Sequence, residues 1–274
     1  MNTKIIGTGY DLPAFAADND YLATLVDTSD EWIVERTGIR TRHLAKEETT
    51  TSMAVRASVQ ALERAGMKAE EIDLLIVATI TGDTETPSTS CRVQAEIGAH
   101  RAVAFDVNAA CSGFLYGMHI AEAFIRSGIY RNALVIGSET MSKIIDWTDR
   151  STCVLFGDGA GAAVLAGTEE PGILSQIVGS NGGKWEVLEC QGRPNENPLN
   201  KEERKPGYLT MNGQEVFKFA VKTVPVCVEE ALEKAGVAAD EVKYFLLHQA
   251  NKRIIQSVAK RLGQPEEKFP MNLD

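Results

Sequence analysis

The chain contains an internal repeat. Residues 61–77 (ALERAGMKAEEIDLLIV) recur at 231–247 (ALEKAGVAADEVKYFLL) at a constant offset of 170 residues, with seven identical positions. Both copies have the pattern of an amphipathic helix, a glycine that ends it, a short turn and a strand. Two unrelated amphipathic helices would not easily share the ungapped turn and strand as well. The repeat therefore predicts two α/β halves, spanning 1–170 and 171–274, that meet near Glu170–Gly172.

Strands and helices alternate in each half, which predicts an α/β fold with mostly parallel sheets covered by helices. In the first half we expect strands at 3–9, 73–79, 102–107, 132–138 and 159–166, and helices at 29–36, 50–65, 88–97 and 112–127. In the second half we expect strands near 173–179 and 242–247, and helices at about 211–235 and 251–262. Only 27 residues follow Leu247, so we expect the second half to be incomplete at its C-terminus.

Composition narrows the function classes. Apolar residues make up 44% of the chain and charged residues 24%, which is ordinary for a soluble globular protein. No apolar run has the length of a membrane span, and the N-terminus lacks the apolar core of a signal peptide. The five cysteines have no paired spacing, which argues against disulfides and a zinc site and for a cytoplasmic location. The net charge of −10 argues against nucleic-acid binding.

One cysteine lies where a predicted strand turns into a predicted helix. Val103–Val107 favours a strand, and an apolar helix pattern runs from about Ser112 to Ser127, where Gly128 can end it. Cys111 therefore lies at a helix N-terminus, whose partial positive charge and free N–H groups favour a thiolate. A thiolate there suits a nucleophile that forms a thioester. The alternative is an ordinary buried cysteine, since this residue type is often buried.

A histidine stands at the corresponding point of the second half. His248 directly follows the predicted strand 242–247, and α/β folds place ligands at the carboxyl ends of strands. Its counterpart in the first copy is Ala78, and Asn251 can cap the next helix. A buried histidine bonded to the backbone is the alternative. We favour shared catalysis, in which one half offers Cys111 and the other His248.

Two further motifs concern nucleotides. The segment Thr28–Arg40 begins with a predicted capping box of Thr28 and Glu31. Trp32 and Arg36 are four residues apart and share a helix face, which suits base stacking and phosphate binding, although ordinary packing with a surface salt bridge fits equally well. The glycine-rich Phe156–Val164 does not have the strand–GxGxxG–helix order, and we interpret it as a tight turn entering a core strand.

Five segments follow the order and residues of a known family: DEWIVERTGIRTRH (30–43), DVNAACSGF (106–114), DRSTCVLFGDGAGAAVL (149–165), MNGQEVFKFAV (211–221) and HQANKRI (248–254). From Ile5 to Asp274 the chain resembles β-ketoacyl-[acyl-carrier-protein] synthase III. The resemblance implies a thiolase fold, a homodimer and no permanently bound cofactor. It also implies the initiation of fatty acid synthesis, in which an acyl-CoA primer condenses with malonyl-carrier protein and CO2 and CoA are released.

The resemblance implies roles for individual residues. Cys111 would be the acylated nucleophile, with its N–H in an oxyanion hole, and His248 would support decarboxylation as a neutral imidazole. Trp32 and Arg150 would hold the CoA adenine between them. The other residues implied near CoA or in the channel for its pantetheine arm are Arg36, Leu155, Gly213, Phe217 and Asn251.

Two expectations concern the carrier protein and the primer. The chain is acidic, so an acidic carrier needs a local basic patch, which we place at Lys218, Lys222, Lys252 and Arg253, with Lys260 and Arg261 further along the next helix. Thr86 falls where the family lines the acyl channel of the partner subunit. Its small side chain favours tolerance of primers longer than acetyl.

The chain departs from the family pattern near its end. The family's catalytic asparagine, in a Gly-Asn-Thr-Ser motif, and a glycine-rich loop would fall beyond Asp274, and Asn272 has the wrong neighbours. We therefore expect the 274-residue chain to condense poorly on its own. Two other functions stay open, namely a Cys-dependent acyl-CoA hydrolase or acyltransferase without condensation, and a non-catalytic dimeric scaffold.

Overall fold

The computed structural model describes residues 1–200 and 207–273, which form two compact units. The first unit contains Met1–Ala16, His43–Met141 and Gly157–Val178, and the second contains Ala17–Arg42, Ser142–Phe156 and Gly179–Asp274. Two segments that precede residue 170 thus belong to the second unit. The division of the chain at residue 170 and the incompleteness of the second half both stay predictions.

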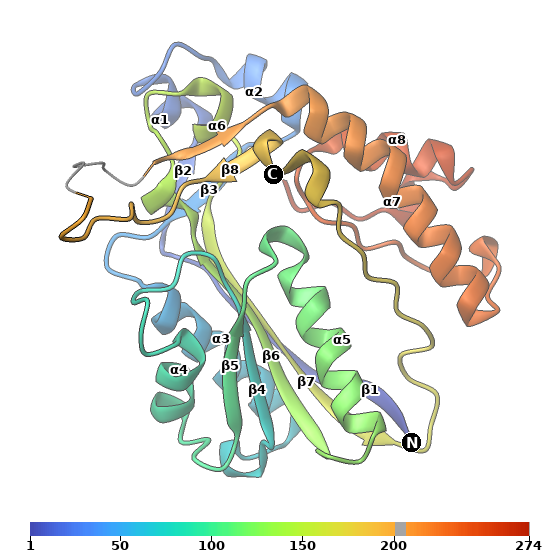
Figure 1. The fold of residues 1–274 in the computed structure, drawn as a ribbon. Coiled ribbons are helices and arrows are strands. Elements are labelled where there is room, and N and C mark those ends of the chain that lie inside the picture. The colour runs from blue at the N-terminus through green and yellow to red at the C-terminus, as the bar shows by residue number, and fades with distance from the viewer. Residues whose placement is uncertain (201–206, 274) are drawn as a thin grey trace. The chain divides into compact units, whose positions relative to one another are not determined.

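The first unit is built on a five-stranded sheet made of β1 (Asn2–Asp11), β4 (Leu74–Ala78), β5 (Val103–Val107), β6 (Asn132–Thr140) and β7 (Asp158–Thr168). The strand order is β1-β7-β6-β4-β5 (Figure 1). β4 pairs in parallel with β5 and β6, whereas β7 is antiparallel to β6 and β1. Four strands therefore run in one direction, which confirms the predicted mostly parallel sheet.

Helices cover both faces of this sheet. The helices α3 (Thr50–Ala65) and α4 (Thr89–Ile97) lie on one face and α5 (Gly113–Arg126) on the other (Figure 1). Successive side chains of β4 alternate between the two resulting cores: Leu75 and Val77 pack on the α3 side, and Leu74 and Ile76 on the α5 side. Because both faces are buried, the strand is apolar throughout rather than alternating with polar residues.

The two copies of the repeat have the same local structure up to the strand. Gly66 and Gly236 end their helices in the left-handed conformation, with φ of 64° and 67°. Each is followed by a 3₁₀ turn in which a glutamate carboxylate accepts a backbone N–H three residues earlier: Glu71 from Lys68 at 2.8 Å, and Glu241 from Ala238 at 2.9 Å. The duplicated helix and turn predicted from the sequence are confirmed.

The second unit is mainly helical. Its longest helix, α7 (Gly213–Ala235), packs with α8 (Lys252–Arg261) around a core in which the Phe245 and Phe269 rings stack with centres 4.8 Å apart. The unit also contains α1 (Asn19–Ala23), α2 (Asp30–Thr37), α6 (Arg150–Cys153) and a small sheet of β8 (Leu188–Cys190) and β9 (Leu209–Met211). β2 (Phe15–Asp18) and β3 (Thr41–Leu44) form a further two-stranded sheet, which the sequence did not predict.

The strands expected at 173–179 and 242–247 are wrong for the chain as described, because both segments are irregular there. A strand requires a ladder of hydrogen bonds to a neighbouring strand. The N–H of Phe245 instead donates to the carbonyl of Lys268, which precedes the loop carrying Phe269. The apolar residues of this segment therefore pack against α7 and α8 without joining a sheet.

The glycine-rich segment before β7 has the structure expected of it. β7 begins at Asp158, directly after the turn, and a Cβ at Gly159 would come within 2.9 Å of Leu12. The predicted core strand and its close packing are confirmed, whereas most of the glycine-rich segment belongs to the strand itself and not to a turn.

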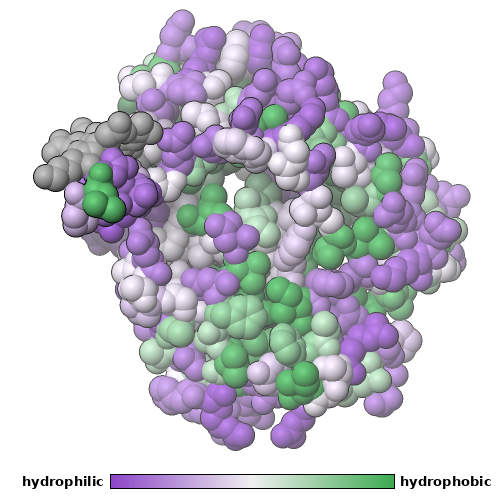
Figure 2. Space-filling view, viewed as in Figure 1, coloured by the Kyte–Doolittle hydropathy of each residue, from purple (hydrophilic) through white to green (hydrophobic). Residues whose placement is uncertain are grey.

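Apolar side chains gather on the face of the sheet that carries α5, as Figure 2 shows. A shallow apolar groove on this face is lined by Ile5, Phe114 and Ala162, together with Thr8 and small residues of β1, β6 and β7. Leu115 on α5 is also exposed. The helix α5 therefore covers only part of this face.

Candidate active site

Cys111 lies in a tight turn between β5 and α5. A 3₁₀ turn over Ala110–Ser112 joins the strand to the helix, and Ala110 has a φ of +44°. A non-glycine residue in this region is strained, and such strain concentrates at functional sites. The predicted position of Cys111 at the strand-to-helix turn is confirmed, although α5 itself begins two residues later, at Gly113.

Two glycines let α5 lie directly on the sheet behind this turn. A Cβ at Gly113 would come within 2.9 Å of the Ala78 methyl, and one at Gly117 would come within 2.9 Å of Val135. Ala78 ends β4 and pairs with Val107 of β5 and Gly137 of β6. The turn that carries Cys111 is thus placed over the carboxyl ends of the three parallel strands.

The electrostatic setting of Cys111 differs from the expectation. Burial raises the pKa of the Cys111 thiol, its backbone N–H lowers it, and the carboxylate of Glu139 raises it further. The residue keeps exposed surface, but enough protein atoms surround the sulfur to disfavour the thiolate. The first unit therefore keeps this cysteine in its thiol form at neutral pH, because burial outweighs the donors of the turn.

Glu139, at the end of β6, was missed by the sequence reasoning. Its carboxylate accepts hydrogen bonds from the Ile80 N–H at 2.9 Å, from the Thr79 hydroxyl at 3.2 Å and from the Thr81 hydroxyl. Burial raises its pKa, and these donors oppose the rise. The available signal was an acidic residue three positions after the apolar run Ala133–Ile136 of β6, at the sheet edge that carries the cysteine.

His248 lies in the irregular segment before α8 rather than at the end of a strand. Burial lowers the pKa of its imidazole below the ordinary histidine value, so the ring is neutral at pH 7. Cys111 belongs to the first unit and His248 to the second.

A cluster of aromatic and cationic side chains stands at α2 in the second unit. The guanidinium carbon of Arg36 lies 4.5 Å from the centre of the Trp32 ring, and that of Arg150 lies 4.6 Å from it. Arg150 also donates to the carbonyl of Asp27 at 2.7 Å. The structure thus brings together three residues predicted to bind a nucleotide, in cation–π contact.

The predicted cap of α2 is wrong by one residue. Ser29, not Thr28, caps the helix and accepts the N–H of Trp32 at 3.2 Å. The helix begins at Asp30, one residue later than the capping box required, because Ser29 holds the extended backbone conformation of a cap. The Thr28 hydroxyl, which the predicted cap would have used, is buried and has no hydrogen-bond partner among the described residues.

The start of α8 is fastened to the end of α2. The Asn251 carboxamide oxygen caps α8 by accepting the N–H of Arg253 at 2.8 Å, which confirms the predicted cap. Its amide nitrogen donates to the carbonyl of Arg36 at 3.1 Å, and Arg253 donates to the carbonyl of Glu35 at 3.2 Å. Asn251 therefore joins the Trp32 cluster through the backbone of α2.

The remaining predicted residues lie on α7 and after α6. Gly213 is the first residue of α7, and Phe217 lies one turn further on, with 37% of its surface exposed. Leu155 lies two residues after the end of α6, which begins with Arg150. A Cβ at Gly213 would meet only Met211, at 3.8 Å, so packing within the chain does not require a glycine there.

Residues 1–200 and 207–273 contain neither a candidate membrane-spanning helix nor a candidate metal site. No helix there combines the length and apolar character that a bilayer crossing would need. No three or more His, Cys, Asp or Glu side chains in this part of the chain gather in a way that could hold a metal ion.

Comparison with known proteins identifies the family. Residues 105–182 match the family described as 3-oxoacyl-[acyl-carrier-protein (ACP)] synthase III, and residues 232–274 match its C-terminal region. The chain is 50% identical over 275 residues to a β-ketoacyl-[acyl-carrier-protein] synthase III of Clostridium botulinum (strain Loch Maree / Type A3), covering 100% of this chain and 84% of that protein. It is also 50% identical over 274 residues to the synthase III of Clostridium perfringens (strain SM101 / Type A), covering 99% of this chain and 85% of that protein.

Solved structures agree. The crystal structure of 3-oxoacyl-[acyl-carrier-protein] synthase III from Aquifex aeolicus VF5 superimposes with a TM-score of 0.92 at 47% identity, covering 99% of this chain and 84% of that one. The chain therefore belongs to the β-ketoacyl-[acyl-carrier-protein] synthase III family, a family of condensing acyltransferases with the thiolase fold.

Proposed function

We propose that the chain is a condensing enzyme that initiates fatty acid synthesis by joining an acyl-CoA primer to malonyl-[acyl-carrier protein]. The observation that carries this is the placement of Cys111 in a strained turn at the carboxyl edge of the sheet, in a chain that is 50% identical to synthases of this family along its whole length. The reaction needs no permanently bound cofactor, because the CoA thioester is itself a substrate.

The first half-reaction acylates Cys111. Its sulfur loses a proton and attacks the thioester carbonyl of the primer, so that a carbon–sulfur bond to Cys111 forms and the bond to CoA breaks. The departing CoA thiolate then takes up a proton. The N–H of Cys111 contributes to an oxyanion hole for the tetrahedral intermediate. Because the free thiol has a raised pKa, deprotonation has to accompany primer binding.

The second half-reaction forms the new carbon–carbon bond. The malonyl group loses CO2, and the electron pair left on its carbon forms an enolate that attacks the acyl-Cys111 carbonyl. The bond to sulfur breaks, which frees Cys111 and leaves a β-ketoacyl-carrier protein. A neutral His248 donates a hydrogen bond to the thioester oxygen as enolate character develops. The lowered pKa of this imidazole supports that role.

The nucleotide end of CoA binds at the Trp32 cluster. The adenine stacks between Trp32 and Arg150, which are in direct contact in the free chain and have to separate to admit it. Arg36 offers a charge to the phosphates. The unpartnered Thr28 hydroxyl supports a polar ligand at this position. The neighbouring binding residues are Asn251 and Gly213, and Phe217 and Leu155 line the path of the pantetheine arm.

The carrier protein docks on a basic surface of α7 and α8 made of Lys218, Lys222, Lys252 and Arg253. Two members of this surface have partners within the chain. Lys218 is ion-paired with Glu215 at 2.8 Å, and Arg253 is bonded to Glu35. The exposed Lys222 and Lys252 therefore carry most of the charge available to an acidic partner.

The active protein is a homodimer that works in the cytoplasm, where its five free cysteines stay reduced. The exposed Thr86 lines the acyl channel of the partner subunit. Within each chain the half 1–170 carries the nucleophile and the half 171–274 carries the histidine.

Intact-mass measurement after incubation with acetyl-CoA tests the proposal. We expect a mass increase of one acetyl group, which Cys111→Ser abolishes. Cys153→Ser serves as the control, because Cys153 is buried in the second unit and should leave labelling intact. Thioester hydrolysis without a stable acyl-Cys111 would favour a hydrolase, and no labelling of the parent chain would refute the proposal.

A further inference from the structure

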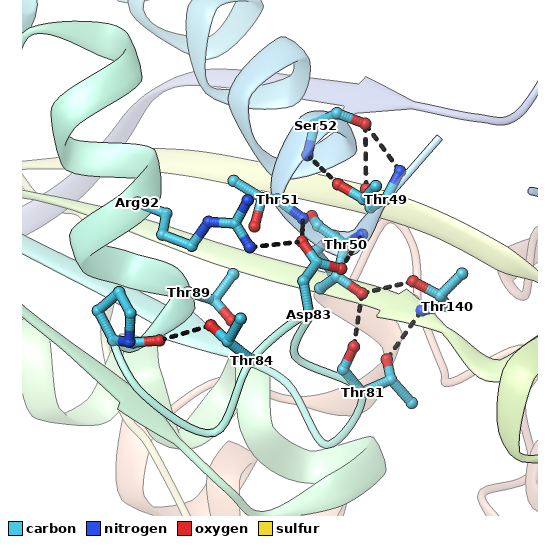
Figure 3. A network of polar contacts seen from close by, with 12 residues as sticks. Thr49, Thr50, Thr51, Ser52, Thr81, Asp83, Thr84, Thr89, Arg92 and Thr140 are labelled. Atoms are coloured by element: carbon cyan, nitrogen blue, oxygen red, sulfur yellow. Dashed lines mark hydrogen bonds and ion pairs between the residues drawn. The ribbon is translucent and has the colours of Figure 1, made fainter. Parts of the chain in front are cut away.

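The loop between β4 and α4, residues Thr79–Ser88, combines a buried base with an exposed tip. Thr81 at its start and Thr89 after its end are buried, whereas Thr84, Glu85, Thr86 and Pro87 are exposed. The Thr84 hydroxyl donates to the carbonyl of Pro87 at 2.9 Å and closes the tip (Figure 3). Exposed loops are ordinarily mobile, so the position of the tip depends on how the rest of the loop is anchored.

The start of the loop is held by β6. Glu139 accepts the three donors of Thr79, Ile80 and Thr81 described above, and the N–H of Thr140 donates to the Thr81 hydroxyl at 2.8 Å. The end of the loop is held by β5, since the Asp106 carboxylate accepts the N–H groups of Thr89 and Ser90, each at 2.8 Å.

A third anchor lies immediately before the tip. The Asp83 carboxylate accepts the N–H of Thr50 at 3.1 Å and that of Thr51 at 2.9 Å, which are the first two residues of α3 (Figure 3). Arg92 of α4 reaches the same carboxylate at 3.5 Å. Asp83 thus binds the positive end of one helix and a cation from a second helix.

These contacts favour a permanently charged Asp83. Burial works against the charged form, but the polar groups of Thr51, Thr49 and Thr50 outweigh it and lower the pKa of Asp83. The Thr50 hydroxyl donates to the carbonyl of Thr81 at 2.7 Å, so α3 grips the loop on both sides of Gly82. The residues on both sides of the tip are therefore anchored by helices and strands of the chain itself.

We infer that Asp83 is a specificity-determining positioning residue, which fixes the tip Thr84–Pro87 and thereby sets how long an acyl primer the enzyme accepts. The inference rests on the proposed function, in which Thr86 lines the acyl channel. Asp83 acts through the tip and does not touch the primer. An asparagine at this position has one carbonyl oxygen in place of the charged pair, so it cannot hold both N–H groups and Arg92 equally well.

The test measures acylation of Cys111 by acetyl-CoA and by hexanoyl-CoA in the full-length chain, followed by intact mass. Changing Asp83→Asn should alter the ratio of the two labelling rates by about fivefold. The effect is smaller than the roughly tenfold or more by which one methylene group changes selectivity in an apolar pocket, because the tip is displaced but not removed. Asp83→Glu, which keeps the charge, should restore most of the parent ratio.

Asp73→Asn is the matched control. Asp73 precedes the same strand β4 at its opposite end, and its carboxylate accepts the N–H of Arg131 at 2.8 Å. It should lower the melting temperature without changing the ratio. Equal slowing of both primers in Asp83→Asn, or the same response as Asp73→Asn, would overturn the inference.

Thr86→Phe distinguishes the role of the tip in the acyl channel from the role of Asp83 in positioning the tip. If it changes the ratio while Asp83→Asn does not, the tip forms part of the channel and only the role of Asp83 is lost. If it leaves the ratio unchanged, the tip is not part of the channel and the inference falls. If neither primer labels the parent chain, the proposed function fails first.

Discussion

The guanidinium carbon of Arg150 lies 4.6 Å from the centre of the Trp32 ring, although 118 residues separate the two in sequence. Arg150 is the first residue of the short helix α6, and its bond to the carbonyl of Asp27 fastens it beside the loop that precedes α2. A planar cation therefore already lies on the indole ring, where a flat ligand would stack, and such a ligand has to displace it.

Trp32→Ala should weaken use of acyl-CoA selectively. Loss of one stacking partner costs about 1–3 kcal/mol, or roughly 10-fold in the rate constant for acylation of Cys111 at low substrate. The rate with acetyl-pantetheine, which lacks the nucleotide, should stay unchanged. Trp147→Ala is the control, because Trp147 lies in the same unit and bonds only to a backbone carbonyl, that of Ser142. Equal losses with both donors would argue against a nucleotide site.

The reactivity of Cys111 should depend on pH in a direction set by its surroundings. Burial and the charge of Glu139 both raise the pKa of the thiol, so alkylation by iodoacetamide should reach half its maximal rate above about pH 8.5, the value for a free cysteine. Glu139→Gln removes one of these causes and should move the midpoint downward. Peptide mass spectrometry distinguishes Cys111 from the other four cysteines.

Glu122→Gln is the matched control for this pH profile. Glu122 is a buried carboxylate on α5, further from the turn, and it is bonded to Gln176. We expect its substitution to leave the midpoint unchanged. A midpoint below that of free cysteine in the parent chain would contradict the assigned setting of Cys111.

Reversing the two exposed lysines of the docking surface should affect only the carrier-dependent step. Lys222→Glu with Lys252→Glu should slow the use of malonyl-carrier protein about 10-fold at low ionic strength and much less at high salt, because surface charges steer association. Acylation of Cys111 by acetyl-CoA should persist. Lys46→Glu with Lys68→Glu makes the same charge change on two exposed residues of the first unit. A similar defect in this double variant would show that net charge, and not the docking surface, is responsible.

Because α5 packs closely on the sheet, adding a single methyl group at Gly117 should lower the free energy of unfolding. Gly117→Ala places a Cβ within 2.9 Å of Val135 and 3.5 Å of Ile76, both in the core. Overpacking costs about 1–3 kcal/mol and the better helix propensity of alanine returns up to about 1 kcal/mol, so the free energy of unfolding should fall by about 1 kcal/mol. Urea denaturation measures it. Gly161→Ala on β7, where a Cβ meets nothing within 4 Å, should be neutral, and equal stability of both variants would rule out the close contact.

The sequence predicted those elements whose signals are local. α3 was predicted with its observed bounds, and the five strands of the first unit were predicted to within two residues. Most of these strands contain a short apolar run, such as Leu74–Ala78 of β4. The prediction of a strand at 242–247 was wrong. The segment has the residue pattern of a strand, but a strand also needs a neighbouring strand to pair with, and no local pattern specifies that neighbour.

Features of the site that depend on a local sequence motif could be predicted, whereas features that depend on tertiary packing could not. The turn at Cys111 and the Trp32–Arg36 pair follow from sequence spacing. The raised pKa of Cys111 depends on burial and on Glu139, 28 residues away, so the helix-end argument gave the wrong direction. The free Thr28 hydroxyl was hidden because the cap was assigned one residue too early.

The strand β4 has no side that faces water, and this has a consequence for synthesis of the chain. Its residues Leu74–Ala78 are all buried in the folded unit, yet both strands that pair with it, β5 and β6, come later in the sequence. A nascent chain therefore exposes five adjacent apolar residues, two of them β-branched, until at least residue 103 has emerged. Glu70, Glu71 and Asp73 stand immediately ahead of this run, and their like charges act as gatekeepers against association of nascent chains.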